Sequence, residues 1–207
     1  MKLLSWDVGI YNLSYCLLEK KDDSDEIKII DWNIVNLVDN EEMKKNRSLL
    51  FENIPRKLHE IPQLFDADIV VIENQPSLKN PQMKSIQMIL YSYFLILGKI
   101  IGNEHGGYID KIEFCSASNK LKVYDGPVIV LEQKVPRKKA QTEEIVQDVP
   151  VKKSNTIKYA DKKRLAIEHT KYFLQKNPEY IDFFNNHKKK DDLADSFLQG
   201  LYYLGKK

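Results

Sequence analysis

The stretch Ile69-Val70-Val71-Ile72-Glu73 decides the fold class, because four consecutive β-branched residues end directly at an acid. An unbroken apolar run of this kind is typical of a central strand that is covered on both faces. The other predicted strands are residues 2–8, 13–19, 27–37 and 109–115, and the predicted helices are residues 41–60, 81–101, 159–176 and a last helix from about Asp191. This order predicts an α/β fold, in which helices flank a mixed five-stranded sheet.

The bulk composition fits one globular domain but does not reveal a partner. The chain has 207 residues, of which 43% are hydrophobic and 30% charged, and its formal net charge is +2. We therefore expect a single domain over residues 1–207. A balance this close to neutral argues neither for nor against nucleic acid, so the distribution of charge has to decide.

One segment departs from the regular pattern of strands and helices. Residues 125–157 contain three prolines and runs of lysine with little periodicity, which predicts a basic, mobile insertion. From Lys134 to Arg164 there are ten Lys or Arg residues against four Asp or Glu residues. This segment and the helix start that follows it therefore carry excess positive charge.

Cysteines and apolar runs bear on the location of the protein. Cys16 and Cys115 belong to no CxxC or Cys/His cluster, which predicts buried, reduced thiols in an intracellular, reducing compartment rather than a zinc site. The first strand begins at once, so we expect no targeting segment before it. The apolar run 86–102 approaches membrane length, but polar residues interrupt it, so we expect a buried helix and no membrane partner.

Four carboxylates occupy positions at which chemistry is expected. Asp7 and Glu73 end apolar strands, while Asp192 and Asp195 stand three residues apart at the start of the last helix. Acids at strand ends and at a helix start can converge above one edge of a sheet, and such a cluster is tolerable mainly when cations neutralise it. Oxygen ligands suit Mg²⁺ or Mn²⁺, and two such ions can promote phosphodiester hydrolysis.

Each acid also has a simpler interpretation. Asp7 could form a turn, Glu73 could simply end a strand, and acids in the first turn of a helix are favoured by its dipole. The dipole explanation is least natural for Asp195, which stands near the apolar face of its helix. His187 could assist proton transfer to a leaving group, although a surface histidine is the simpler interpretation.

Three segments that contain these acids resemble the acidic motifs of RuvC-type Holliday junction resolvases. They are residues 7–14 (DVGIYNLS), 72–76 (IENQP) and 190–196 (KDDLADS). The resemblance is closer to the branch found in poxviruses and other large DNA viruses, and residues 114–122 (FCSASNKLK) also look like a segment of that branch. It covers nearly the whole chain except residues 125–157, and the ordered set of three motifs is more specific than any one of them.

The resemblance implies an RNase H-like fold, a homodimer and Mg²⁺-dependent paired nicking of four-way DNA junctions. This activity would serve recombination and the resolution of replicating viral DNA, in the host cytoplasm or a virus factory. Asp7, Glu73, Asp192 and Asp195 match the metal-binding acids of the family, and Asp191 is an extra neighbour. The insertion at 125–157 departs from the compact family pattern and leaves open how DNA is held there.

A junction-binding surface needs lysine and arginine for phosphate contacts. The candidates are Lys120, Lys122, Lys162, Lys163 and Arg164, with residues 188–190 just before the acids. A solvated surface explains any single lysine equally well. However, residues 162–164 place cations at a helix start, where the dipole prefers acids, and this mismatch favours an anionic partner.

The helix predicted at 83–101 is apolar almost all round, so more than one of its sides must be covered. Burial under the insertion would satisfy this requirement. A twofold interface would satisfy it as well, and we favour the interface because it would place two active sites symmetrically for paired cuts.

Other functions use the same residues. An RNase H or a transposase-like nuclease needs the same acids, so the acids do not separate these substrates from a junction. A non-catalytic DNA-binding protein on the same fold would not need all four acids, and here all four are present. An actin-type or sugar-kinase-type ATPase also begins with an Asp-x-Gly strand, but it needs roughly twice this length.

Overall fold

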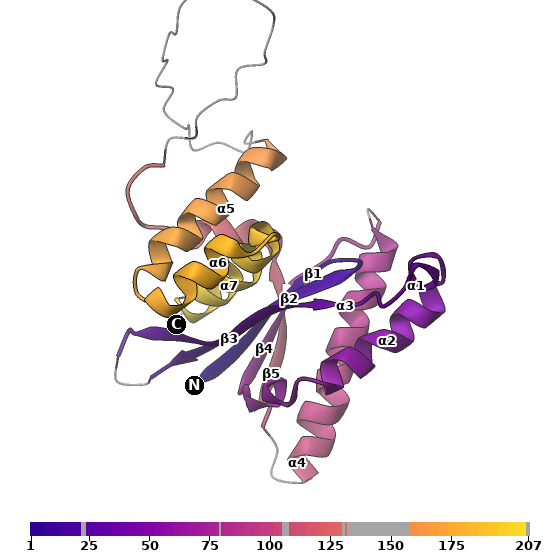
Figure 1. The fold of residues 1–207 in the computed structure, drawn as a ribbon. Helices are drawn as coiled ribbons and strands as arrows, with labels where there is room; N and C mark the ends of the chain where they lie inside the picture. Colours follow the sequence, from indigo (N-terminus) through magenta and orange to yellow (C-terminus); the bar gives the residue numbers. More distant parts are fainter. Residues whose placement is uncertain (22–23, 79, 105–107, 130, 132–157, 206–207) are drawn as a thin grey trace, which may run out of the picture.

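A computed structural model describes the chain except residues 22–23, 79, 105–107, 130, 132–157 and 206–207. Most of the insertion predicted at 125–157 therefore lies outside the described residues. The fold is an α/β sandwich in which one sheet separates two groups of helices (Figure 1).

The sheet has five strands, as the sequence predicted, and their order is β3-β2-β1-β4-β5. β1 pairs antiparallel with β2 and parallel with β4, so the sheet is mixed. β4, the strand that decided the fold class, is buried over its first five residues and stands between β1 and β5. The strands are β1 (Lys2–Val8), β2 (Asn12–Lys20), β3 (Ile27–Asn36), β4 (Ile69–Asn74) and β5 (Lys111–Ser116).

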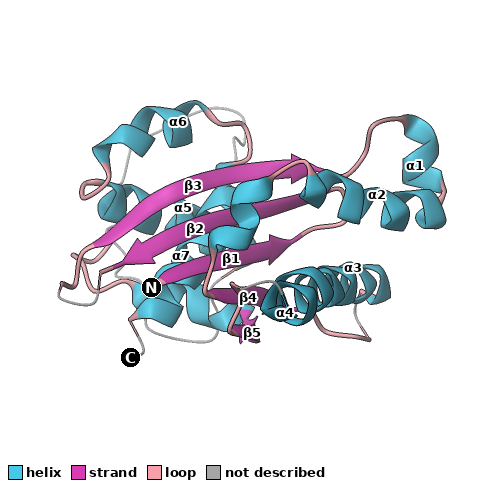
Figure 2. Ribbon diagram, turned by 90° about the horizontal axis from the view of Figure 1, so that it is seen from below, coloured by secondary structure: helices cyan, strands magenta, loops and turns pink. Residues whose placement is uncertain are grey.

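Two layers of helices cover the sheet, one on each face (Figures 1 and 2). One layer consists of α1 (Glu41–Lys45), α2 (Arg47–His59), α3 (Pro81–Tyr93) with its π-helical continuation η2 (Phe94–Ile101), and the short α4 (Gly102–Glu104). The other consists of α5 (Tyr159–Leu174), α6 (Ile181–Asn186) and α7 (Lys190–Leu204). Three 3₁₀ helices complete the described structure: η1 (Pro62–Asp66), η3 (Ala117–Val123) and η4 (Pro178–Tyr180).

The helix predicted at 41–60 is in fact two helices. The chain breaks at Asn46, whose backbone is extended and whose side chain accepts hydrogen bonds from the backbone N–H groups of Ser48 and Leu49. An asparagine is among the best N-caps, so it ends α1 and starts α2 although the apolar spacing continues. Helix α6 and the 3₁₀ helices were not predicted, because such short elements carry little periodicity.

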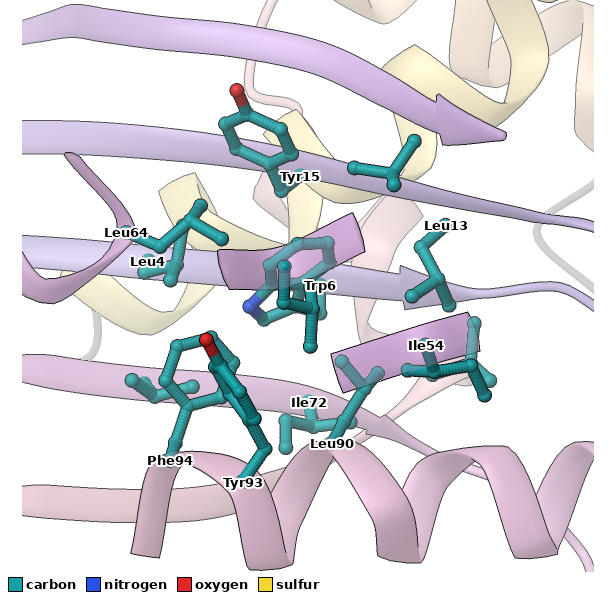
Figure 3. Packing of buried hydrophobic residues seen from close by; sticks show 14 of the residues in the cluster. Leu4, Trp6, Leu13, Tyr15, Ile54, Leu64, Ile72, Leu90, Tyr93 and Phe94 are labelled. Atoms are coloured by element: carbon teal, nitrogen blue, oxygen red, sulfur yellow. The ribbon is translucent and has the colours of Figure 1, made fainter. Parts of the chain in front are cut away.

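The core beneath α2 and α3 joins the two strands that matter most for the site. Trp6 of β1 is fully buried and packs at 5.1 Å, centroid to centroid, from Tyr15 and at 6.0 Å from Phe94 (Figure 3). Ile72 of β4 and Leu90 of α3 belong to the same cluster. This packing holds the ends of β1 and β4 side by side. A second core lies under α7 and contains Cys16 and Cys115, which are buried and free, as predicted.

The apolar run is a helix that packs on the sheet with one side only. Within the described part of the chain, Pro81–Ile101 is the one helix whose length and composition would allow it to cross a membrane. Ile86, Leu90 and Phe94 are buried against the sheet, as expected for a core helix. The opposite side carries exposed Met88, Ile96, Ile100 and Ile101, which together we call the α3 stripe.

Candidate active site

Three of the four predicted acids meet at one edge of the sheet. β1 and β4 run parallel with Trp6 opposite Ile72, so the next residues along the two strands, Asp7 and Glu73, lie next to each other. α7 crosses this edge and contributes Asp195. The convergence predicted from strand ends and a helix start is therefore found in the structure.

A lysine stands at the centre of these acids. The Nζ atom of Lys120 lies 2.6 Å from Oδ1 of Asp7, 3.3 Å from Oε1 of Glu73 and 3.2 Å from Oδ2 of Asp195. We call these four residues the acid cluster. The sequence analysis placed Lys120 on the DNA-binding surface, but the structure leaves it only 4% exposed. The reason is that η3 folds back directly after β5 and points Lys120 inward.

The cluster has more acidic than basic groups, and the pKa values of Glu73, Asp195 and Lys120 are all shifted. Burial and the Asp7 carboxylate raise the pKa of Glu73 to about 8, against the opposing effect of Lys120. Burial raises the pKa of Asp195 to about 6, although Lys120 works to lower it. Burial alone would lower the pKa of Lys120, but its three acidic neighbours raise it above the ordinary value. Carboxyl groups perturbed in this way are typical of functional sites.

Asp192 and Asp191 lie beside the cluster and differ from each other. The side chain of Asp192 is 30% exposed, with Lys189 at 3.5 Å, and burial together with the charges of Asp191 and Asp7 raises its pKa. Asp191 accepts a hydrogen bond from Lys163, which lowers its pKa although burial works in the opposite direction. Asp192 therefore interacts electrostatically with the acid cluster, whereas Asp191 pairs with Lys163 of α5.

Buried polar contacts fix α7 against the sheet and so place Asp195. Gln199, one turn after Asp195, donates through Nε2 to the backbone carbonyl of Trp6 at 3.0 Å and to Oγ of Ser5 at 3.1 Å. The next residue is Gly200, at which a Cβ atom would come within 2.6 Å of Leu18. The same Cβ atom would lie 3.2 Å from Ser5, so the helix approaches both β2 and β1 closely.

Known proteins share part of this sequence and its fold. No protein-family model matches the chain. The uncharacterized protein L451 of Acanthamoeba polyphaga mimivirus is 38% identical over 155 residues, which are 73% of this chain and 33% of that protein. The chain therefore spans about a third of the length of this relative.

Solved structures match over nearly the whole chain. The yeast mitochondrial Holliday junction resolvase Ydc2 matches with a TM-score of 0.59 and 19% identity, over 98% of this chain and 78% of that one. The Fowlpox virus resolvase, solved with substrate Holliday junction DNA, matches with a TM-score of 0.55 and 21% identity, over 100% and 98% of the two chains. RuvC of Thermus thermophilus matches with a TM-score of 0.55 and 11% identity, over 98% and 92%.

The chain has the RNase H-like fold of the RuvC-type resolvases. The resemblance drawn from the three acidic segments is thus confirmed for the fold. In this resolvase fold, the acid cluster lies where β1, β4 and α7 meet.

The carboxylate oxygens of the cluster are ligands of the chemical type that binds a hard divalent cation. Three carboxylate oxygens within 3.3 Å of one nitrogen already surround a positive charge, and carboxylate oxygen is the ligand that Mg²⁺ and Mn²⁺ prefer. Among the described residues, no group of Asp, Glu, His or Cys side chains forms a preformed metal cage. The ammonium of Lys120 takes the central place in this arrangement.

The other predicted basic residues lie nearer the surface than Lys120. Lys122 and Lys162 are exposed, and Lys122 donates to Oδ1 of Asn119 at 2.8 Å. Lys163 is partly exposed and bound to Asp191, and Arg164 lies 3.8 Å from Asp161. These four residues lie at or near the surface, although two of them already have acidic partners.

His187, considered as a proton donor, has a structural contact in the described residues. Its Nδ1 atom accepts a hydrogen bond from the backbone N–H of Lys189 at 3.0 Å, in the turn that leads into α7. This contact supports the simpler interpretation, in which the histidine shapes a surface turn.

Proposed function

We propose that the chain is a metal-dependent, structure-selective DNA endonuclease that resolves four-way junctions by paired symmetric nicks. The observation that carries the proposal is the convergence of Asp7, Glu73 and Asp195 in a resolvase fold, with Asp192 beside them. We place this activity inside the cell, in recombination and in the resolution of replicating DNA.

The four acids would hold two divalent cations. Bound Mg²⁺ or Mn²⁺ would supply an activated water and stabilise the leaving oxygen of the phosphodiester. Asp7 and Glu73 come from the rigid sheet, so they would define one side of the site, while α7 brings Asp195 and Asp192 from the other side. Lys120 holds three of these carboxylates together without a cation, and a cation would bind them in competition with its ammonium.

The four outward-lying basic residues would hold the DNA. Lys162, Lys163 and Arg164 lie near the start of α5, after its first three residues, and Lys122 lies at the end of η3. α5 packs against both η3 and α7, so these cations are carried by the same layer as Asp195. Phosphate contacts from several elements would orient a branched substrate before the acids reach the strand to be cut.

The α3 stripe would form the interface of a homodimer. Its four residues are between 40% and 50% exposed, which is unusual for a row of large apolar side chains on one helix. A twofold axis at this helix would bury the same stripe on both copies and place two acid clusters symmetrically. Paired cuts on one junction require such symmetry.

One observation favours a second candidate. The ammonium of Lys120 could permanently occupy the place of a metal cation among the acids and leave a non-catalytic DNA-binding protein on the same fold. An RNase H-like or transposase-like nuclease on another substrate would need the same acids as a junction resolvase.

Cleavage of a labelled four-way junction, compared with a linear duplex of matching sequence and with an RNA–DNA hybrid, tests the proposal. We expect paired symmetric nicks on the junction only, with Mg²⁺ and not with EDTA. Asp7→Asn should abolish the cuts and retain junction binding. Cleavage of the duplex or the hybrid would reject the junction specificity, and binding without any cleavage would support the non-catalytic candidate.

A further inference from the structure

Two buried amides connect Glu73 of the acid cluster with α3. Gln75 is 7% exposed, and its Nε2 atom donates to Oε2 of Glu73 at 2.8 Å. The backbone N–H of Gln75 in turn donates at 2.8 Å to Oε1 of Gln87, which is fully buried on α3. The two contacts form one path from the helix to the carboxylate.

Because of the first contact, the two carboxylate oxygens of Glu73 have different partners. Oε1 faces the ammonium of Lys120 at 3.3 Å, while Oε2 is held by Gln75. A hydrogen bond to one oxygen restricts rotation of the carboxylate about its last bond, so the other oxygen stays directed at the cluster. Partners of this kind orient the groups that bind metals.

The second contact fixes the orientation of the Gln87 amide. Its Oε1 atom accepts from Gln75 and also from Nζ of Lys84 at 3.1 Å, so a flipped amide would set its NH₂ group against two donors. Its Nε2 atom is buried and has no hydrogen-bond partner among the described residues. An amide that served packing alone would be expected to satisfy both of its ends, and departures of this kind gather at functional sites.

We propose that Gln75 is the positioning residue of Glu73, and that Gln87 makes the position of this carboxylate depend on how α3 is seated. The inference rests on the proposed function, because it assigns Glu73 to metal binding. The same helix carries the α3 stripe on its exposed side. Pairing of two copies through that stripe would thus act on the metal site through Gln87 and Gln75.

Gln75→Met and Gln87→Met remove these hydrogen bonds while keeping the length of the side chain. The control is Asn53→Leu on α2, which removes a buried amide that donates to the Leu37 carbonyl at 3.1 Å and to Asp39 at 3.0 Å, outside the acid cluster. Binding of Mn²⁺ to the DNA-free protein is measured by calorimetry. The Mn²⁺ concentration that gives half-maximal junction cleavage is measured separately.

We expect Gln75→Met to weaken Mn²⁺ binding by roughly tenfold, and Gln87→Met to weaken it by a smaller factor in the same direction. Junction binding in EDTA should match the wild type, and Asn53→Leu should bind Mn²⁺ as the wild type does. Mn²⁺ affinities of both Met variants within about twofold of the control would overturn the inference. A wild-type chain that neither binds Mn²⁺ nor cuts would instead reject the proposed function itself.

Discussion

Replacing Glu73 by Gln should make the metal-free protein more stable than the wild type at pH 8, and about equally stable at pH 5. The pKa of this carboxyl rises from 4.5 to about 8 in the folded protein, chiefly because the group is buried and lies beside Asp7. Between these two values the folded state keeps a proton that the unfolded state has released. Stability therefore falls as the pH rises through this window.

The size of the stability difference follows from the pH interval between the unfolded and folded pKa values of Glu73. Within this window, each pH unit lowers the free energy of unfolding of the wild type by about 1.4 kcal/mol. By pH 8 the wild type should therefore be less stable than Glu73→Gln by roughly 3–5 kcal/mol. Glutamine carries no proton to lose, and its amide oxygen can still accept the hydrogen bond from Gln75. At pH 5 the wild-type carboxyl is protonated in the fold, so the two proteins should nearly coincide.

Urea unfolding in EDTA at pH 5, 6, 7 and 8 measures this difference in the free energy of unfolding. Equal denaturant slopes for the two proteins would show that the same states are compared. Adding Mn²⁺ at pH 8 should reverse the order, because a cation stabilises only the ionised carboxylate of the wild type. A difference that stays constant from pH 5 to pH 8 would refute the reasoning and leave Glu73 as an ordinary ion-paired acid.

Further predictions concern the other charges and the α3 stripe. Lys120→Met should destabilise the metal-free protein by about 3 kcal/mol at pH 8, since it leaves buried acids without their counter-charge, and saturating Mn²⁺ should restore the melting temperature. Ile96→Asp should convert the proposed dimer to a monomer in sedimentation without loss of fold, because this side chain is 48% exposed; an unchanged mass would remove the stripe from the interface. Replacing Lys162, Lys163 and Arg164 together by Gln should reduce the slope of log Kd for junction DNA against log salt by about 2–3, and an unchanged slope would assign all three to solvent.

The sheet and the meeting of three acids could be predicted because both follow from local patterns. A continuous β-branched run indicates a central strand, and an acid at its end must lie at the edge of the sheet. Asp7 and Glu73 needed only the parallel pairing of two such strands to become neighbours. Asp195 followed from helical spacing, which places it three residues after Asp192 and near the apolar face of α7.

The centre of the cluster could not be predicted in the same way. Lys120 belongs to a 3₁₀ helix of seven residues, whose direction depends on packing against α7 rather than on periodicity. In the sequence it stands beside Lys122, and nothing in the sequence distinguishes the buried lysine from the exposed one. Gln75 and Gln87 were missed for a similar reason, since a hydrogen bond between residues twelve apart has no local signature.

The charges of the acid cluster favour a cation site over a purely structural network. Lys163 and Asp191 on the same chain show what a balanced pair does, because this one-to-one contact lowers the pKa of the acid. In the acid cluster, three carboxyl groups share a single ammonium, so the acids outnumber their counter-charge. Burial raises the pKa values of Glu73 and Asp195, and the charge of Asp7 raises them further, even though each acid touches an ammonium. A network that served stability alone would gain from a second basic side chain or from fewer acids, whereas bound divalent cations would supply the positive charge that the cluster lacks.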